Sequence, residues 1–269
     1  MVKRGGGFRG IDARVLPIID DDDSSHIVVA HVEVDCRDAM GANLVNTVAE
    51  AVAPTIADVV GSAVREDAPT VGLRILTNLA TKRLARATAR FTPGELATSA
   101  TADDGEAVAR GILAAYRFAR ADPYRACTNN KGVMNAISSV ALATGQDWRA
   151  VEAAAHAYCA LKAAGGSSFY APMADWAIDA DTGDLVGTLE LPIAVGLVGG
   201  AVKVHPAARA NVNILGVTTA ADLAKVLVAA GLAQNFAALR ALATDGIQRG
   251  HMRLHERSRG DQASQKASS

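Results

Sequence analysis

The hydrophobic periodicity of this chain changes near Thr92, and the change limits the possible folds more than any other feature. Before it, four segments show the alternation or the β-rich composition of strands: residues 11–19, 26–35, 71–78 and 83–91. Between the second and third segments, apolar residues recur at helical spacing over residues 44–59, where Pro54 is predicted to kink the helix. This order predicts a small split sheet with helices on one side.

After Thr92 the apolar positions mostly follow the helical period. The predicted helices cover residues 103–120, a segment starting near Lys131, a segment starting at Asp147, residues 219–230 and 232–243 with a break at Gly231, and a short segment around His251. Residues 176–195 predict a β-hairpin that turns at 181–184, and the polar tail from Ser258 is predicted to be disordered. The fold class is therefore α+β, with a mainly helical larger part.

Composition excludes several classes of protein. Half of the 269 residues are hydrophobic, 20% are charged, and the net charge is −1, so nothing favours nucleic acid or an acidic membrane as a partner. The longest apolar run, residues 191–202, is too short to span a membrane. Three widely spaced cysteines, Cys36, Cys127 and Cys159, predict reduced thiols. We expect a soluble cytoplasmic protein.

The richest polar motif lies in residues 122–148 around an apolar run. It contains Arg125, Asn129, Asn130, Lys131, Asn135 and Asp147. A lysine at an apolar helix start can lose hydration and act as an acid or an electrostatic catalyst. Asp147 precedes the next helical pattern, where a carboxylate is favoured by the helix dipole. The alternative is a surface lysine and an ordinary N-capping aspartate.

Two glycine-containing loops are candidate ligand sites. DAMGAN, residues 38–43, puts Gly41 and small residues at a helix start, where a phosphate can approach backbone amides, although it is not a GxGxxG fingerprint. GLVGGA, residues 196–201, is either a second close-approach loop or a plain turn. The Thr77–Asn78 pair either presents an amide to a ligand or caps a turn.

The sequence predicts no metal site. His251 and His255 are one helical turn apart, but no third ligand stands out and no HExxH pattern is present, so a proton-donating histidine is preferred to a metal ligand. The alternative for His251 is a surface histidine in a basic helix. The acidic run at residues 20–25 is interpreted as a solvated turn.

Four blocks together carry a resemblance that no single motif has. DAMGAN, NNKGVMN, GTLELPIAVGLVGGAVKVHP and GIQRGHMRLH occur in this order, and the chain from about Arg4 to His255 resembles class II 3-hydroxy-3-methylglutaryl-CoA reductase, the soluble prokaryotic form. The resemblance implies a ferredoxin-like cofactor domain, incomplete here, at residues 1–92. It also implies a large substrate domain at 93–250 and a shortened C-terminal flap and tail at 251–269.

The resemblance also implies an activity. The family interconverts 3-hydroxy-3-methylglutaryl-CoA and mevalonate plus coenzyme A, using NAD or NADP and two hydride transfers, at sites formed between two subunits. Lys131 would stabilise the oxyanion, Asp147 would hydrogen-bond this lysine, and His251 would protonate the departing thiolate. Arg125 and Asn135 would contact the substrate. The positions expected to line the dinucleotide are Asp38, Met40, Gly41, Asn43 and Asn78.

The chain departs from the family pattern at both ends. The catalytic glutamate belongs to a block N-terminal to the matching region, and the segment that decides between NAD and NADP falls there too. The chain is therefore interpreted as a fragment, a truncated product or one piece of a split enzyme. The competing hypotheses are a non-catalytic remnant that still binds coenzyme A or nucleotide or dimerises, and a generic CoA-binding module.

Overall fold

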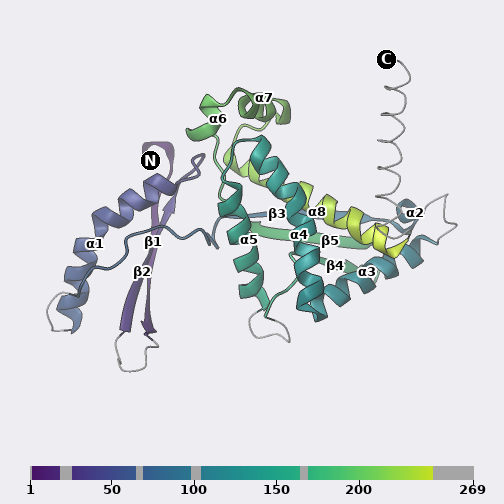
Figure 1. Ribbon diagram of the computed structural model, residues 1–269, viewed down its shortest axis with the longest axis horizontal. Helices are drawn as coiled ribbons and strands as arrows, with labels where there is room; N and C mark the ends of the chain where they lie inside the picture. The colour runs from purple at the N-terminus through teal and green to yellow at the C-terminus, as the bar shows by residue number, and fades with distance from the viewer. Residues whose placement is uncertain (1, 19–25, 65–68, 98–103, 164–168, 245–269) are drawn as a thin grey trace, which may run out of the picture.

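The computed structural model describes residues 2–18, 26–64, 69–97, 104–163 and 169–244. It contains a two-stranded sheet and a three-stranded sheet, both antiparallel, together with a layer of helices, which confirms the predicted α+β class. The two-stranded sheet and its helix lie at one end of the molecule in Figure 1, apart from the second sheet and the large helices.

The first sheet is a hairpin of β1 (Gly7–Pro17) and β2 (His26–Asp35), preceded by a short 3₁₀ helix at Val2–Arg4. After β2 comes α1 (Ala42–Val64), which continues through Pro54. The two strands and the helix are where the sequence predicted them. Residues 71–78, also predicted as a strand, form no strand within the described chain, and the Leu76 amide instead donates to Asn46 Oδ1 at 2.8 Å.

The second sheet has the order β3-β5-β4, formed by β3 (Leu84–Phe91), β4 (Ala174–Ile178) and β5 (Leu185–Pro192). The β4–β5 hairpin was predicted, but the expectation that residues 83–91 join a split sheet with the first two strands is wrong. β3 pairs with β5, about a hundred residues away. Alternate β3 residues pack on the main core: Ala85, Ala87, Ala89 and Phe91. Three small side chains let a helix lie close to this strand.

The helices that pack around this sheet are α3 (Gly105–Ala121), α4 (Pro123–Ala143), α5 (Trp148–Ala163) and α8 (Ala220–Ala243). Three short helices complete the set: α2 (Pro93–Leu96), α6 (Gly200–Val204) and α7 (Pro206–Leu215). α8 contacts β3, β5, α3 and α4, so it lies at the centre of the core (Figure 1). Fully buried Ile112, Ile137, Leu189, Leu227 and Leu239 fill the space between these elements.

Two predicted helix boundaries are wrong, each for a local reason. α4 begins at Pro123, because the Asp122 side chain accepts from the Tyr124 and Arg125 amides and proline suits the first helical turn. Lys131 therefore lies in the middle of a helix. α8 continues through Gly231, where a Cβ atom would lie 2.8 Å from the Ile137 side chain. This glycine lets α8 cross α4 closely instead of breaking the helix.

Two helices are long and apolar enough to cross a membrane, at residues 42–63 and 220–243. The second is α8, the central helix of the core, and it is long and apolar because it packs against other elements on several sides. The first, within α1, has only 11% of its most apolar window buried. Two such helices are weak evidence for a membrane.

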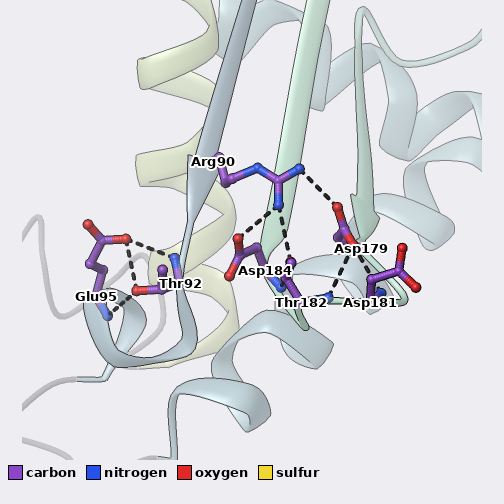
Figure 2. Close-up of polar contacts among 7 residues, drawn as sticks. All are labelled: Arg90, Thr92, Glu95, Asp179, Asp181, Thr182 and Asp184. Carbon is purple, nitrogen blue, oxygen red and sulfur yellow. Dashed lines mark hydrogen bonds and ion pairs between the residues drawn. The ribbon is translucent and has the colours of Figure 1, made fainter.

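One polar cluster joins the end of β3 to the β4–β5 turn. Figure 2 shows the Arg90 guanidinium between two carboxylates, at 2.8 Å from Asp184 Oδ2 and 2.9 Å from Asp179 Oδ2. Asp179 also accepts from the amides of Asp181 and Thr182. The Arg90 hydrogen bond, followed by these two amides, lowers the pKa of Asp179.

This lowered pKa predicts a specific acid response. Because the folded-state pKa of Asp179 lies below its unfolded value of 3.8, the stabilisation is complete above that value and is lost as the pH falls through the folded-state pKa. Arg90→Met should therefore lower the melting temperature at pH 6 and reduce its fall between pH 6 and pH 3. The control is Arg110→Met, which removes an exposed pair with Glu106. Equal acid slopes for Arg90→Met and the wild type would contradict the assignment.

Candidate functional site

The loop that leads from β2 into α1, residues 36–41, is held by one arginine. The Arg83 guanidinium donates to the carbonyl oxygens of Arg37, Ala39 and Met40 in this loop, and to that of Val195 at 2.6 Å. Burial lowers the pKa of Arg83, although an arginine stays charged. The guanidinium thus ties the DAMGAN loop to the segment after β5.

A second loop meets the first backbone to backbone. A Cβ atom on Gly196 would lie 2.3 Å from the Met40 amide nitrogen, so only glycine fits between the two loops. The amides of Leu197 and Val198 donate to the Asp38 carbonyl, and Asp38 Oδ1 accepts from the Ala220 amide at the start of α8. GLVGGA is therefore a close-approach loop, as one of the two alternatives predicted.

The same geometry gives structural roles to two of the predicted cofactor residues, Gly41 and Asp38. Gly41 has a φ of +104°, and a Cβ there would lie 2.5 Å from Cys36 Sγ, so this position requires glycine. The Asp38 carboxylate already has a structural partner at α8, although its predicted role was to line the dinucleotide. The loop is thus preformed before any ligand arrives.

Arg83→Met should release this loop. The change removes every hydrogen bond from the guanidinium to the loop and leaves the carbonyls of Ala39 and Met40 without this donor. The free energy of unfolding should fall by about 2–3 kcal/mol. Hydrogen exchange at the Leu197 and Val198 amides should accelerate. Arg86→Met is the matched control, because Arg86 lies three residues further on, in β3, and is exposed. Unchanged exchange in Arg83→Met would show that the loop holds without this clamp.

The turn between α4 and α5 joins this loop junction through one side chain. The Gln146 amide donates to the Gly196 carbonyl at 3.0 Å and accepts from the Gly196 amide at 2.8 Å. The next residue, Asp147, caps α5, with Oδ1 accepting from the Ala150 amide at 3.1 Å, and it lies 3.7 Å from the Arg149 guanidinium. The alternative of an N-capping aspartate therefore describes Asp147 in this chain.

Of the other three predicted cofactor residues, Met40 lies in the clamped loop, while Asn43 and Asn78 are exposed. Asn43 lies in the first turn of α1, a turn without an acidic residue. Asn78 belongs to a short turn in which its carbonyl accepts from Ala80, while Thr77 Oγ1 accepts from Leu79. Thr77 therefore has the turn-capping role, and the Asn78 side chain is exposed.

A second candidate surface is the exposed face of α4. Its residues recur at helical spacing and all are exposed: Tyr124, Thr128, Lys131, Asn135, Ser139 and Leu142. Polar side chains occupy the middle of this face, and the apolar Tyr124 and Leu142, which are 85% and 59% exposed, lie at its ends. In the described part of the chain, Lys131 has no hydrogen-bond or ion-pair partner. Arg125, half-buried on an adjoining face, has its pKa lowered by burial.

The opposite side of α4 is fixed by buried amides. Asn130 Oδ1 accepts from the Met173 amide and its Nδ2 donates to the Ala171 carbonyl, both at 2.8 Å. Asn129 accepts from Asn235 Nδ2 at 3.0 Å, and Asn235 in turn accepts from the Trp176 indole at 2.8 Å. This chain of hydrogen bonds joins α4 to α8 and β4 immediately beneath the lysine.

Within the described chain, Lys131 and Asp147 are not brought together. The helix between Lys131 and Ala143 rises about 18 Å at 1.5 Å per residue, and Asp147 follows its end. The predicted pairing of these two residues therefore does not form inside one copy. Arg125, Lys131 and Asn135 lie within α4, whereas Asp147 follows Gln146, which is hydrogen-bonded to the loop junction.

His251 lies outside the described residues. Sequence reasoning missed Arg83, Gln146 and Asn235, because each acts on a segment far away in the chain. The arginine and its Val195 partner are 112 residues apart. The NN pair before Lys131 was the one local signal of the buried amides.

Comparison with known proteins completes the assignment. The family model for hydroxymethylglutaryl-coenzyme A reductase matches residues 1–256. The 3-hydroxy-3-methylglutaryl-coenzyme A reductase of Archaeoglobus fulgidus is 51% identical over 257 residues, which cover 96% of this chain and 53% of the relative. A probable 3-hydroxy-3-methylglutaryl-coenzyme A reductase of Borreliella burgdorferi is 37% identical over 255 residues, which cover 95% of this chain and 54% of the relative.

Solved structures give the same answer. The class II 3-hydroxy-3-methylglutaryl-CoA reductase of Streptococcus pneumoniae, bound to NADPH in open conformations, aligns with a TM-score of 0.78 and 39% identity over 94% of this chain and 56% of that one. The chain thus spans about half the length of the relatives it matches. By sequence and by fold, it belongs to the hydroxymethylglutaryl-coenzyme A reductase family.

Proposed function

We propose that this chain supplies the lysine-bearing helix and the dinucleotide loop of a hydroxymethylglutaryl-CoA reductase. The reaction would interconvert 3-hydroxy-3-methylglutaryl-CoA and mevalonate plus coenzyme A, with two hydride transfers and NAD or NADP. The observation that carries the proposal is the α4 face, where Lys131 and Asn135 are exposed on a helix fixed from behind by buried amides. Family membership supplies the substrate class.

Lys131 would act electrostatically. An ammonium on a rigid helix, with no described partner to neutralise it, can stabilise the negative charge that develops on the thioester carbonyl oxygen. Asn135, one turn further on, and Arg125 would bind the polar groups of the substrate. His251 would donate a proton to the coenzyme A thiolate as it leaves, a task that suits a group titrating near neutrality.

The loop junction fits a dinucleotide. α1 starts directly after Gly41 and has no acidic residue in its first turn, so its positive end suits a phosphate. Asp38 and Met40 lie in the clamped loop, and the exposed amides of Asn43 and Asn78 are available to bind the ribose or nicotinamide groups. The bound nicotinamide would supply the hydride, while the loop binds and orients it.

The distance along α4 between Lys131 and Asp147 favours a homodimer. Two copies related by a two-fold axis can place the Lys131 face of one subunit against the Asp147 turn and loop junction of the other. The exposed Tyr124 and Leu142 at the two ends of the α4 face supply apolar area for such an interface. Each complete site would then need both subunits.

The domain division remains part of this proposal. We place the cofactor part within residues 1–92, the substrate part at 93–250 and the flap with the tail at 251–269. β3 falls in the first range by number but pairs with β5 of the second sheet. A soluble, cytoplasmic enzyme acting on small molecules agrees with the net charge of −1.

A non-catalytic protein that retains nucleotide binding or dimerisation is the second candidate. It is favoured by the Asp147 carboxylate, which caps α5 and lies 3.7 Å from the Arg149 guanidinium instead of contacting Lys131. The two candidates differ in turnover and not in fold.

Nicotinamide absorbance separates them. The purified chain would be incubated with mevalonate, coenzyme A and either NAD⁺ or NADP⁺, alone and with the part of the Archaeoglobus fulgidus reductase that lies outside the match. An increase in absorbance at about 340 nm, where the reduced nicotinamide absorbs, would support the reductase and identify its cofactor. No growth in either mixture, with nucleotide binding retained, would support the non-catalytic candidate.

A further inference from the structure

The two short helices α6 and α7 lie beside each other (Figure 1) and, with the loops next to them, form a groove. We propose that this groove binds an organic anion with an apolar chain, that is, an alkyl or acyl chain that ends in a phosphate or carboxylate group. None of the residues that line it belongs to the predicted catalytic, substrate or cofactor positions. The inference therefore does not rest on the proposed activity.

The helices around the groove are held in place by local contacts. His205 separates α6 from α7 and caps α7, with Nδ1 accepting from the Ala208 amide at 3.4 Å. Gly216 ends α7 with a φ of +66°, which favours glycine. Asn211 Nδ2 donates to the Ala143 carbonyl at the end of α4 at 2.8 Å, so α7 is attached to the main helical layer. The groove is thus formed before any ligand arrives.

Apolar side chains make up most of the lining. Val202 is 9% exposed, and three others are partly buried: Leu197, Val212 and Val217. The groove has a volume of about 480 Å³. Small-molecule sites usually have roughly 300–1,000 Å³ and are lined mainly by apolar groups. An alkyl chain in the groove would remove these side chains from water, which is favourable.

The polar part of the lining carries positive charge. Lys203, Arg209 and Asn213 are exposed along the groove, and neither cation has a hydrogen-bond or ion-pair partner in the part of the chain that the structure describes. The sequence has no acid between Glu190 and Asp222, so this segment contains no carboxylate to neutralise them. An arginine fork and a lysine ammonium are the groups that bind phosphate and carboxylate.

The two parts of the lining together determine the class of ligand. Inorganic phosphate would pair with the cations and leave the apolar side chains in water, whereas a neutral alkane would cover the apolar side chains and leave the cations unpaired. Val204 and Ile214 are 80% and 82% exposed on the same helices but do not line the groove. The apolar lining is recessed between two helices, which suits a single chain better than a membrane surface.

A bound chain would contact the loop junction described above. The Leu197 side chain lines the groove, while the Leu197 amide donates to the Asp38 carbonyl at 2.8 Å. A ligand packed on this side chain stabilises the closed state of the hydrogen bond. Hydrogen exchange at the Leu197 amide should therefore become slower when the groove is occupied.

Calorimetric titration of the chain with decyl phosphate, below its critical micelle concentration, tests the proposal. Inorganic phosphate and decanol, which each lack one of the two features, should bind at least about tenfold more weakly. The double variant Lys203→Gln with Arg209→Gln should weaken decyl phosphate binding by at least about tenfold, with unchanged circular dichroism because both side chains are exposed. The matched control is Arg110→Gln with Arg117→Gln, which removes the same charge from exposed positions of α3.

Decyl phosphate binding that only the groove variant weakens, with slower exchange at the Leu197 amide, would support the proposal. No binding, equal weakening by the α3 variant, affinity no higher than that of inorganic phosphate, or slower exchange confined to other segments would overturn it. Binding to phosphatidylglycerol vesicles that the groove variant abolishes, without binding of decyl phosphate, would overturn it in favour of a membrane surface. The titration measures binding alone, so a failure here would leave the proposed reductase activity intact.

Discussion

Asn235→Ala should lower the free energy of unfolding by about 3 kcal/mol. Asn235 is 2% exposed and bonds the Trp176 indole and the Asn129 amide at 2.8 and 3.0 Å. Alanine would leave both partners buried without these hydrogen bonds, and the loss of a bond to a buried polar group costs about 1–3 kcal/mol for each group left unpaired.

Thermal and chemical unfolding of the chain would measure this loss. The matched control is Gln234→Ala, which removes an exposed amide from the preceding position of the same helix. The control should change the free energy of unfolding by less than about 0.5 kcal/mol. If the two variants were equally stable, the buried amides would not be what holds α4 to α8 and β4.

Lys131→Ala should reduce turnover of the completed enzyme by about a thousandfold, the upper range for removing one preorganised stabiliser of a developing oxyanion. Because Lys131 is exposed and has no described partner, the variant should fold with unchanged stability. Steady-state mevalonate oxidation, measured with the complementing half present, would test this. Retained turnover would remove Lys131 from the mechanism, and a large loss of stability would assign it a structural role instead.

Subunit mixing would test the proposed dimer, in which Lys131 of one subunit faces Asp147 of the other. Lys131→Ala and Asp147→Ala are each inactive in the proposed scheme, but a mixed dimer regains one intact site. Random mixing of equal amounts should then recover about a quarter of the wild-type activity, because half the dimers are mixed and each has one of two sites. No recovery on mixing would mean that both residues act within one subunit.

The proton-donor role of His251 has its own signature. His251→Gln should slow the thioester step more than the reduction of free mevaldehyde, because only the thioester step releases a thiolate that needs a proton. Stopped-flow absorbance with each substrate would separate the two. Equal slowing of both steps would argue against the leaving-group role.

Local patterns predicted most of the elements, and their failures have physical causes. The residue-to-residue alternation of β1 and β2 and the turn between β4 and β5 are encoded locally, so they were found. Residues 71–78 have the right composition for a strand, but a strand also needs a partner, and the described chain offers none. The early start of α4 was missed because the prediction rested on the apolar run after Lys131, whereas the helix begins at the Asp122 cap and Pro123.

The candidate site was predictable in its residue types and not in its geometry. A lysine beside paired amides suggested chemistry on one stretch of chain. Sequence alone could not reveal that Asn129 and Asn130 face inward while Lys131 faces outward, or that Arg83 reaches across to Val195. Such contacts depend on how distant elements pack, which the order of residues along one segment does not encode.

The contact between Gly196 and Met40 has a mechanical consequence. Because no side chain separates the two backbones, no change of rotamer at that point can absorb a displacement. A ligand that shifts the loop at residues 36–41 would therefore move Gly196 and, through the paired amide of Gln146, the turn that carries Asp147. Nucleotide occupancy and the placement of that carboxylate would then be coupled reciprocally, so substrate bound near the turn would alter the affinity of the loop for nucleotide by the same factor.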